Sequence, residues 1–165
     1  IPNTVKKSLK NILSFHPTYT TLHALGGSDM LKECVNLKKE LNSSTNLIGV
    51  TILTSFDHNS LNEVGISGTV NMNVEKLSEL AFNNGMDGVV CSPMEIRKVK
   101  ESFGSKLKAI APGIRNNTDI SNDQRRTLSA KEAIDLGADI IVIGRPITSA
   151  ESPAKAAEIF LQSIK

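Results

Sequence analysis

The sequence is poor in several kinds of residue, and each scarcity excludes a class of protein. Among 165 residues there is no tryptophan, one tyrosine and only two cysteines, Cys34 and Cys91. The cysteines lack metal-ligand spacing, which excludes a disulfide-rich secreted scaffold and indicates reduced core residues of a cytoplasmic protein. No apolar run is long enough to span a membrane, and no pattern typical of a secretory signal opens the chain. We therefore expect no membrane partner.

An excess of charge of one sign is also missing. Lysine and arginine number 19 against 17 aspartates and glutamates, which gives a formal net charge of +2. The basic residues are scattered, apart from Lys38-Lys39 and Arg125-Arg126. Because a nucleic-acid-binding domain normally carries a clustered basic surface, we expect no nucleic-acid partner. Hydrophobic residues make up 39% of the chain, and nothing resembles a linker, so residues 1–165 are expected to form a single domain.

Short β-branched runs alternate with amphipathic segments along the chain. The expected strands are Thr18–Leu25, Leu47–Thr54, Gly88–Cys91, Leu107–Ala111 and Asp139–Gly144. Several of them are almost continuously apolar, which is typical of strands buried on both faces of a parallel sheet. Helices are expected between the strands, with apolar faces formed by Val5, Leu9, Ile12 and Leu13; by Leu31, Cys34, Val35 and Leu41; by Val74, Leu77 and Ala81; and by Ala157, Phe160, Leu161 and Ile164.

Capping residues indicate where the helices begin and end. Residues 92–95 and 129–132 have the serine-to-glutamate pattern of a capping box, and Ser152 followed by proline predicts the start of the last helix. Three glycines fall where helices should stop, namely Gly85, Gly104 and Gly137. These signals agree with the strand–helix alternation.

The order is one helix followed by five strand–helix units, which predicts an α/β fold with a parallel sheet. An open doubly wound sheet and a closed (β/α)₈ barrel both fit this alternation. Five units in 165 residues average about 33 residues each, and eight units would need about 260, close to the usual ~250 residues of a barrel. The unit length favours a (β/α)₈ TIM barrel, represented here by about five units, with the first three units preceding Ile1.

Two consecutive strand ends carry residues suited to phosphate binding. The last expected strand runs into Gly144-Arg145, where glycine allows close backbone approach and arginine supplies a charged fork of donors. The preceding strand runs into Arg115 and a long polar loop that ends at Gln124. Taken singly, these features are more typical of a tight turn and a surface insertion. Because loops after the last two strands of a (β/α)₈ barrel commonly bind phosphate, together they predict a phosphate site.

Four further features have structural as well as functional interpretations. Thr54-Ser55 ends an expected strand, so its hydroxyls either face the substrate end of the barrel or form a local turn. His23 is expected to be a packed, hydrogen-bonded histidine rather than a base. Cys91-Ser92 is expected to supply a core thiol and a helix cap. Asp57-His58 has no evident third triad member or metal ligand beside it, so we assign no metal site.

Six short motifs occur in a fixed order along essentially the whole chain. They are Ile1-Pro2-Asn3-Thr4, residues 50–55 (VTILTS), 88–92 (GVVCS), 111–115 (APGIR), 123–126 (DQRR) and 143–146 (IGRP). Each is weak alone, but the six in register resemble the bacterial-type orotidine 5′-phosphate decarboxylase family. The resemblance implies a (β/α)₈ barrel that acts as a homodimer, needs no metal or organic cofactor, and converts orotidine 5′-monophosphate to uridine 5′-monophosphate in pyrimidine synthesis.

The resemblance also implies roles for individual residues. The 5′-phosphate would be held by Arg115, Gln124, Gly144 and Arg145, and Gln124 would also close a lid loop over the nucleotide. Thr54 and Ser55 would lie beside the pyrimidine. Ile1, Pro2, Asn3 and Thr4 would belong to a segment that reaches across the dimer into the partner's site.

The catalytic groups of the family lie outside residues 1–165. In the family, a strand with an Asp-x-Lys-x-x-Asp pattern runs directly into the Ile-Pro-Asn-Thr motif, so that pattern would precede Ile1. We therefore expect residues 1–165 to span helix 3 through helix 8 of the barrel, to hold no catalytic residue, and to be inactive and poorly stable alone. Two alternatives are a related phosphate-binding barrel lyase or epimerase, and a non-catalytic nucleotide-binding fragment.

Overall fold

Strands and helices alternate through residues 1–115 and 126–164, which are the residues described by the computed structural model. The strands are β1 (Tyr19–His23), β2 (Asn46–Val50), β3 (Gly88–Val90), β4 (Lys108–Ala111) and β5 (Ile140–Ile141). The α-helices are α1 (Pro2–Leu13), α2 (Gly27–Glu40), α3 (His58–Glu63), α4 (Val70–Asn83), α5 (Ile96–Phe103), α6 (Ala130–Asp135), α7 (Arg145–Thr148) and α8 (Pro153–Ser163). Three 3₁₀ turns complete the list: η1 (Ala24–Gly26), η2 (Pro93–Glu95) and η3 (Gly104–Lys106).

The five strands form one parallel sheet whose spatial order is the chain order, β1-β2-β3-β4-β5. Every neighbouring pair is parallel, beginning with Tyr19 opposite Asn46 and ending with Ala111 opposite Ile141. A doubly wound sheet would reverse its strand order at a switch point, whereas a (β/α)₈ barrel adds each strand beside the last. The sequential order therefore matches part of a barrel, as the length of the units predicts.

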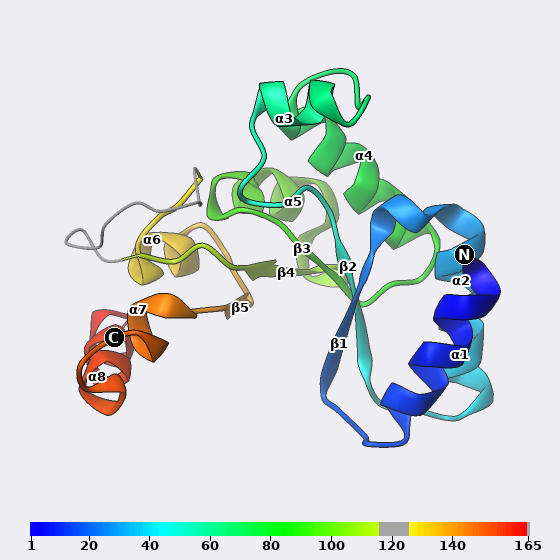
Figure 1. Ribbon diagram of the computed structural model, residues 1–165, viewed down its shortest axis with the longest axis horizontal. Helices are drawn as coiled ribbons and strands as arrows, with labels where there is room; N and C mark the ends of the chain where they lie inside the picture. Colours follow the sequence, from blue (N-terminus) through cyan, green and yellow to red (C-terminus); the bar gives the residue numbers. More distant parts are fainter. Residues whose placement is uncertain (116–125, 165) are drawn as a thin grey trace.

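The helices follow one another along the sheet in the same order. Helix α1 packs against α2, α2 against α4, α4 against α5, and α6 against α8. Figure 1 shows α1 and α2 at the β1 end of the sheet, α4 and α5 near its middle, and α6 to α8 at the β5 end. The N-terminus accordingly lies at one end of the sheet and the C-terminus at the other.

The core lies between the sheet and these helices, and aliphatic side chains dominate it. Its largest fully buried members include Leu31, Leu47, Ile48, Val89 and Leu107. The central strands are buried on both faces, whereas β1 exposes alternate residues and β5 is half-buried. Burial of an aliphatic side chain contributes about 1.5–3 kcal/mol, so these contacts are the main source of stability.

All five expected strands are present, but several are shorter than the apolar runs that predicted them. Strand β2 ends at Val50 instead of Thr54, and β5 is limited to Ile140–Ile141 instead of extending to Gly144. Within the described residues β5 pairs only with β4, so its ladder ends where β4 ends. Apolar residues beyond a ladder, such as Val142, continue as extended or turning chain.

The expected helix faces are largely confirmed, with three exceptions. Leu9, Leu13, Cys34, Val74, Ala81 and Phe160 are buried, as helical spacing predicts. Ile12, Leu41 and Leu161 are exposed, so their assignment to the core was wrong. Ile12 and Leu161 line grooves beside the edge strands β1 and β5, where no further strand covers them among the described residues. Leu41 follows the last residue of α2 and lies beyond the helix face.

Two of the three predicted serines cap their helices through their side chains, whereas Ser152 precedes α8 without a side-chain cap hydrogen bond. Ser129 and Glu132 form a reciprocal capping box at α6, and the Ser92 side chain accepts a hydrogen bond from Met94 N at η2. Gly85 and Gly137 follow α4 and α6 at φ of 79° and 101°, a region that favours glycine. In the described part of the chain, no helix is long and apolar enough to cross a membrane.

Candidate functional site

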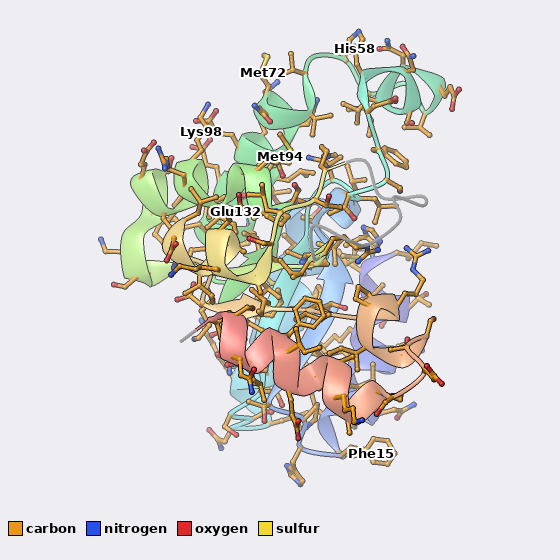
Figure 2. The ribbon with its side chains drawn as sticks, turned by 90° about the vertical axis from the view of Figure 1, so that its left-hand side faces the viewer. Phe15, His58, Met72, Met94, Lys98 and Glu132 are labelled. Atoms are coloured by element: carbon orange, nitrogen blue, oxygen red, sulfur yellow. The ribbon has the colours of Figure 1, made fainter. Side chains whose placement is uncertain are left out.

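Most of the residues predicted to bind a ligand follow the carboxyl ends of the strands. Because the sheet is parallel, these ends share one edge. The Thr54-Ser55 segment follows β2, Arg115 follows β4 and Gly144-Arg145 follows β5. Figure 2 shows His58 and Met94, which follow β2 and β3, toward one end of the molecule and Phe15, which precedes β1, at the opposite end.

Residues on the two sides of the stretch 116–125 meet after the end of β4. Arg115 N donates a hydrogen bond to Leu128 O at 3.0 Å, and Ile114 forms an isolated parallel bridge with Leu128. The half-buried Arg115 side chain donates from Nη1 to Ile114 O at 2.7 Å. Gln124 lies outside the described residues, so only the bases of the predicted lid loop are placed. These bases lie beside the end of β4, where a phosphate loop is expected.

The segment after β5 turns at once into the short helix α7. Gly144 is the residue before this helix, with φ −95° and ψ −105°, and its carbonyl accepts hydrogen bonds from Ile147 N at 2.9 Å and Thr148 N at 3.0 Å. A Cβ at Gly144 would meet no atom within 4 Å, so space is open on that side of the backbone. Arg145 is exposed at the start of α7. Since β4 and β5 are neighbours, Arg145 and Arg115 extend from adjacent strand ends.

The Thr54-Ser55 segment is held in a tight turn after β2. Phe56 N donates a hydrogen bond to Leu53 O at 2.9 Å, which makes Thr54 and Ser55 the two central residues of a four-residue turn. Both are half-buried. Of the two interpretations of this pair, the turn is therefore observed, and it orients both residues at the strand-end edge of the sheet.

A buried ion pair that the sequence did not predict lies beside this turn. The Arg126 guanidinium donates from Nη1 to Glu95 Oε1 and from Nη2 to Leu53 O, the latter at 2.8 Å. The side chains of Arg126 and Glu95 are 12% and 5% exposed. Burial raises the pKa of the Glu95 carboxyl, while the neighbouring charge of Arg126 opposes that rise. Glutamate at this position predicts a helix cap, but no local signal predicts its distant arginine partner.

Two other interpretations from the sequence have clear outcomes. His23 is exposed at the end of β1 and lines the groove beside α1, so the expectation of a packed histidine was wrong. Strand β1 lies at the edge of the described sheet, and an edge strand leaves alternate side chains exposed. Asp57 caps α3 by accepting a hydrogen bond from Ser60 N at 2.9 Å. The exposed His58 imidazole lies 3.3 Å from Asn62 Nδ2.

The first four residues form the exposed start of α1. Ile1 is 87% exposed, and its carbonyl accepts a hydrogen bond from Val5 N at 3.0 Å. Pro2 occupies the first helical turn, where its missing N–H costs nothing, and Asn3 and Thr4 are exposed. Helix α1 packs beside β1 so that Val5 and His23 line the same groove, which places this start at the strand-end edge.

The sequential parallel sheet and the two arginine-bearing strand ends can be compared with known proteins. Residues 1–160 match the family described as orotidine 5′-phosphate decarboxylase / HUMPS. The chain belongs to this family. The expected resemblance is therefore confirmed over nearly the whole chain.

Individual relatives give the same result. The chain is 43% identical over 164 residues to the orotidine 5′-phosphate decarboxylase of Wolbachia pipientis from Culex pipiens, covering 99% of this chain and 71% of the relative. It is 39% identical over 164 residues to the protein of the same name from Idiomarina loihiensis, with coverage of 99% and 71%. The matched region is thus a contiguous family segment that leaves part of each relative unmatched.

Solved structures agree with the fold. The orotidine 5′-phosphate decarboxylase of Lactobacillus acidophilus superposes with a TM-score of 0.81 at 35% identity, covering 100% of this chain and 71% of that chain. An enzyme from Methanocaldococcus jannaschii, solved with the inhibitor BMP, gives 0.73 at 21% identity and coverage of 100% and 69%. The five-stranded sheet with its alternating helices is part of a TIM barrel.

Proposed function

We propose that this protein decarboxylates orotidine 5′-monophosphate to uridine 5′-monophosphate, a step of de novo pyrimidine biosynthesis. The observation that carries the proposal is the 43% identity to a relative named for this activity, over 99% of the chain. The family description also covers HUMPS members, which keeps a related sugar-phosphate barrel lyase or epimerase as the alternative. The named relatives favour the decarboxylase.

We propose that the 5′-phosphate binds between the ends of β4 and β5. Arg115 and Arg145 extend from these adjacent strand ends, and the open space beside Gly144 allows an anion to approach the backbone. Guanidinium groups suit this task because their fork of N–H donors matches phosphate oxygens. Gln124 is proposed as a further phosphate ligand, although it lies outside the described residues. Thr54 and Ser55 are proposed to lie beside the pyrimidine.

The chemistry itself requires groups of another kind. Loss of CO₂ leaves negative charge on a ring carbon, which needs a nearby cation and a proton donor. We propose that an Asp-x-Lys-x-x-Asp segment preceding Ile1 supplies both, and we assign no catalytic residue within residues 1–165. Phosphate contacts from Arg115 and Arg145 then contribute remote binding energy that holds the pyrimidine in place. Neither a metal nor an organic cofactor enters this proposal.

The complete fold is proposed to contain three further β/α units beside those described. Within the described residues, β1 and β5 each have one unpaired edge. A groove of about 360 Å³ lined by Val5, Leu9 and Met30 lies beside β1, and one of about 350 Å³ lined by Ile141 and Phe160 lies beside β5. Three units inserted between these edges would complete eight strands and cover both apolar grooves.

A homodimer with shared sites is proposed because the chain belongs to the family that its motifs resemble, and that resemblance implies a dimer. Ile1, Pro2, Asn3 and Thr4 lie at the start of α1, at the strand-end edge of the sheet. A partner subunit would bury this segment beside its own nucleotide. The biosynthetic role and the reduced, buried cysteines favour a cytoplasmic location.

A carboxyl-labelled substrate tests the proposal directly. The complete gene product is incubated with orotidine 5′-monophosphate, and both labelled CO₂ and uridine 5′-monophosphate are quantified. We expect the two products in equal amounts. Release of neither product, combined with binding of uridine 5′-monophosphate, would instead indicate a non-catalytic nucleotide-binding protein. Failure to bind either nucleotide would favour the related sugar-phosphate barrel.

A further inference from the structure

Arg126 connects three neighbouring units at the strand-end edge of the sheet. Its Nη2 donates to the carbonyl of Leu53 after β2, its Nη1 donates to Glu95 after β3, and its own carbonyl accepts a hydrogen bond from Ser92 Oγ at 3.1 Å. Two residues further on, Leu128 bridges to Ile114 after β4. The side chain and carbonyl of Arg126 thus link the ends of β2 and β3 to the segment that Leu128 joins to the end of β4.

The carbonyl that Arg126 contacts belongs to the turn that presents Thr54 and Ser55. Leu53 O accepts both Phe56 N, which closes the turn at 2.9 Å, and Arg126 Nη2 at 2.8 Å. A second, longer contact joins Nη2 to Ile52 O at 3.5 Å. The guanidinium therefore binds the first carbonyl of the turn, the same atom that closes it.

Glu95 in turn fixes the guanidinium. Its carboxylate is almost completely buried, and Arg126 is the cation that pairs with it, so removing Arg126 alone would leave a buried charge without its counter-ion. The planar fork of an arginine can bind Glu95 and Leu53 at once, whereas the single ammonium of a lysine offers no such fixed geometry. A buried ion pair contributes little net stability, so what this pair supplies to the site is the fixed geometry of its contacts with Leu53 and Glu95.

We propose that Arg126 is a positioning residue for the base-binding turn Leu53–Phe56. It does not touch the nucleotide; it holds Leu53 O so that Thr54 and Ser55 meet the pyrimidine, and Glu95 holds Arg126. This inference rests on the proposed nucleotide-binding function. It predicts that disturbing Arg126 weakens recognition of the base while leaving recognition of the sugar phosphate intact.

The test separates positioning from stability in the complete enzyme. Arg126→Met combined with Glu95→Gln removes both charges, which avoids the cost of an isolated buried carboxylate. Arg126→Lys keeps a cation beside Glu95 but loses the fork. Arg97→Met, at an exposed arginine of α5, is the matched control. Melting temperature, KM and kcat for orotidine 5′-monophosphate, and calorimetric affinities for uridine 5′-monophosphate and ribose 5-phosphate are measured for each.

We expect the double variant and Arg126→Lys to raise KM and the Kd of uridine 5′-monophosphate about tenfold, because the displaced turn loses about one hydrogen bond to the base. The Kd of ribose 5-phosphate should stay within about twofold, as should every constant of Arg97→Met. Unchanged nucleotide affinity in both Arg126 variants would mean that the pair is only structural. Equal losses of affinity for uridine 5′-monophosphate and ribose 5-phosphate would also overturn the inference, because Arg126 would then affect binding of the sugar phosphate and not of the base.

The wild-type enzyme keeps the two proposals apart. If wild type neither turns over orotidine 5′-monophosphate nor binds uridine 5′-monophosphate, the proposed function fails and this inference fails with it. If wild type is active and the Arg126 variants keep its nucleotide affinity, only the role of Arg126 is disproved.

Discussion

Asp87 and Asp139 hold equivalent positions in two different β/α units. Each precedes a strand, and each carboxylate accepts the backbone N–H of the preceding strand, from Leu47 and Ala109, both at 2.7 Å. Each also pairs with a lysine from the helix before that strand, Lys38 in α2 and Lys100 in α5. The same hydrogen bond and ion pair therefore occur twice at the amino-terminal edge of the sheet, where they connect strands to helices.

Asp87→Ala should lower the free energy of unfolding by about 1–2 kcal/mol, because it removes a charge-assisted hydrogen bond to Leu47 N and leaves Lys38 unpaired. Urea unfolding of the complete protein measures the loss. Asp135→Ala is the control, since Asp135 pairs with Lys131 only on the exposed surface of α6 and should change little. An equal loss of unfolding free energy in the two variants would contradict the proposed stabilising role of Asp87.

Gly88→Ala should destabilise the protein by about 1–3 kcal/mol through overpacking between β3 and β4. A Cβ at this position would lie 2.7 Å from Lys108 O and 2.8 Å from Lys108 Cβ, too close to both. Gly49→Ala is the comparison, because its Cβ would meet Ala81 Cβ at 3.3 Å and needs a smaller shift. Thermal unfolding, followed by circular dichroism, should give Gly88→Ala a lower melting temperature than Gly49→Ala. The opposite order would refute the packing argument.

Neither thiol should react with Ellman's reagent in the native protein at pH 8. Burial raises the pKa of Cys91 to about 12, so almost none of the reactive thiolate is present, and burial also raises the pKa of Cys34. Both thiols are free and buried, as the sequence indicates. In urea the reagent should modify Cys34 and Cys91 together. Rapid modification of the folded protein would show that one of these strands or helices opens readily.

The capping box at α6 should depress the pKa of Glu132, whose carboxylate accepts hydrogen bonds from Ser129 Oγ and Ser129 N. A folded-state pKa below the unfolded value contributes stability above the unfolded pKa, and that stability is lost as pH falls through the folded pKa. Ser129→Ala should return the Glu132 pKa toward its usual value and cost about 1 kcal/mol of stability. Titration by NMR follows Glu132; an unchanged midpoint in Ser129→Ala would exclude this cause.

Arg145→Ala should weaken uridine 5′-monophosphate binding about tenfold to a hundredfold, because a guanidinium–phosphate contact contributes roughly 1.5–3 kcal/mol. Binding of uridine, which has no phosphate, should not change. Isothermal titration calorimetry with both ligands measures the difference, and Arg97→Ala serves as the control at an exposed arginine. Equal weakening for uridine would remove Arg145 from the phosphate site.

The sequence predicts those features whose causes are local. Continuous apolar runs such as the one around Leu47 locate the strands, and the serine-to-glutamate spacing at Ser129 locates a helix start. The exposure of His23 could not be predicted in this way, because it depends on β1 lying at an edge of the described sheet. The strand lengths could not be predicted for the same reason, since hydrogen-bond pairing stops where the neighbouring strand ends.

The site residues likewise fall into those that can be predicted from the sequence and those that cannot. Arginines that directly follow apolar strands, Arg115 and Arg145, can be found from sequence because a parallel sheet brings all carboxyl ends together. The pairing of Arg126 with Glu95 joins residues 31 positions apart in different units, and Arg126 lies in a polar segment without periodicity. Only the three-dimensional register of β2, β3 and β4 brings that pair beneath Leu53.

The sequential order of the strands also bears on how the molecule is made. Each of the five described strands pairs with the next one along the chain, so in the proposed barrel only the closing pair of strands is far apart in sequence. The entropy lost in closing each β–α–β connection is correspondingly small. As a ribosome extends the chain, β2 can dock on β1, β3 on β2 and so on, each newly emerged unit covering the exposed edge left by its predecessor.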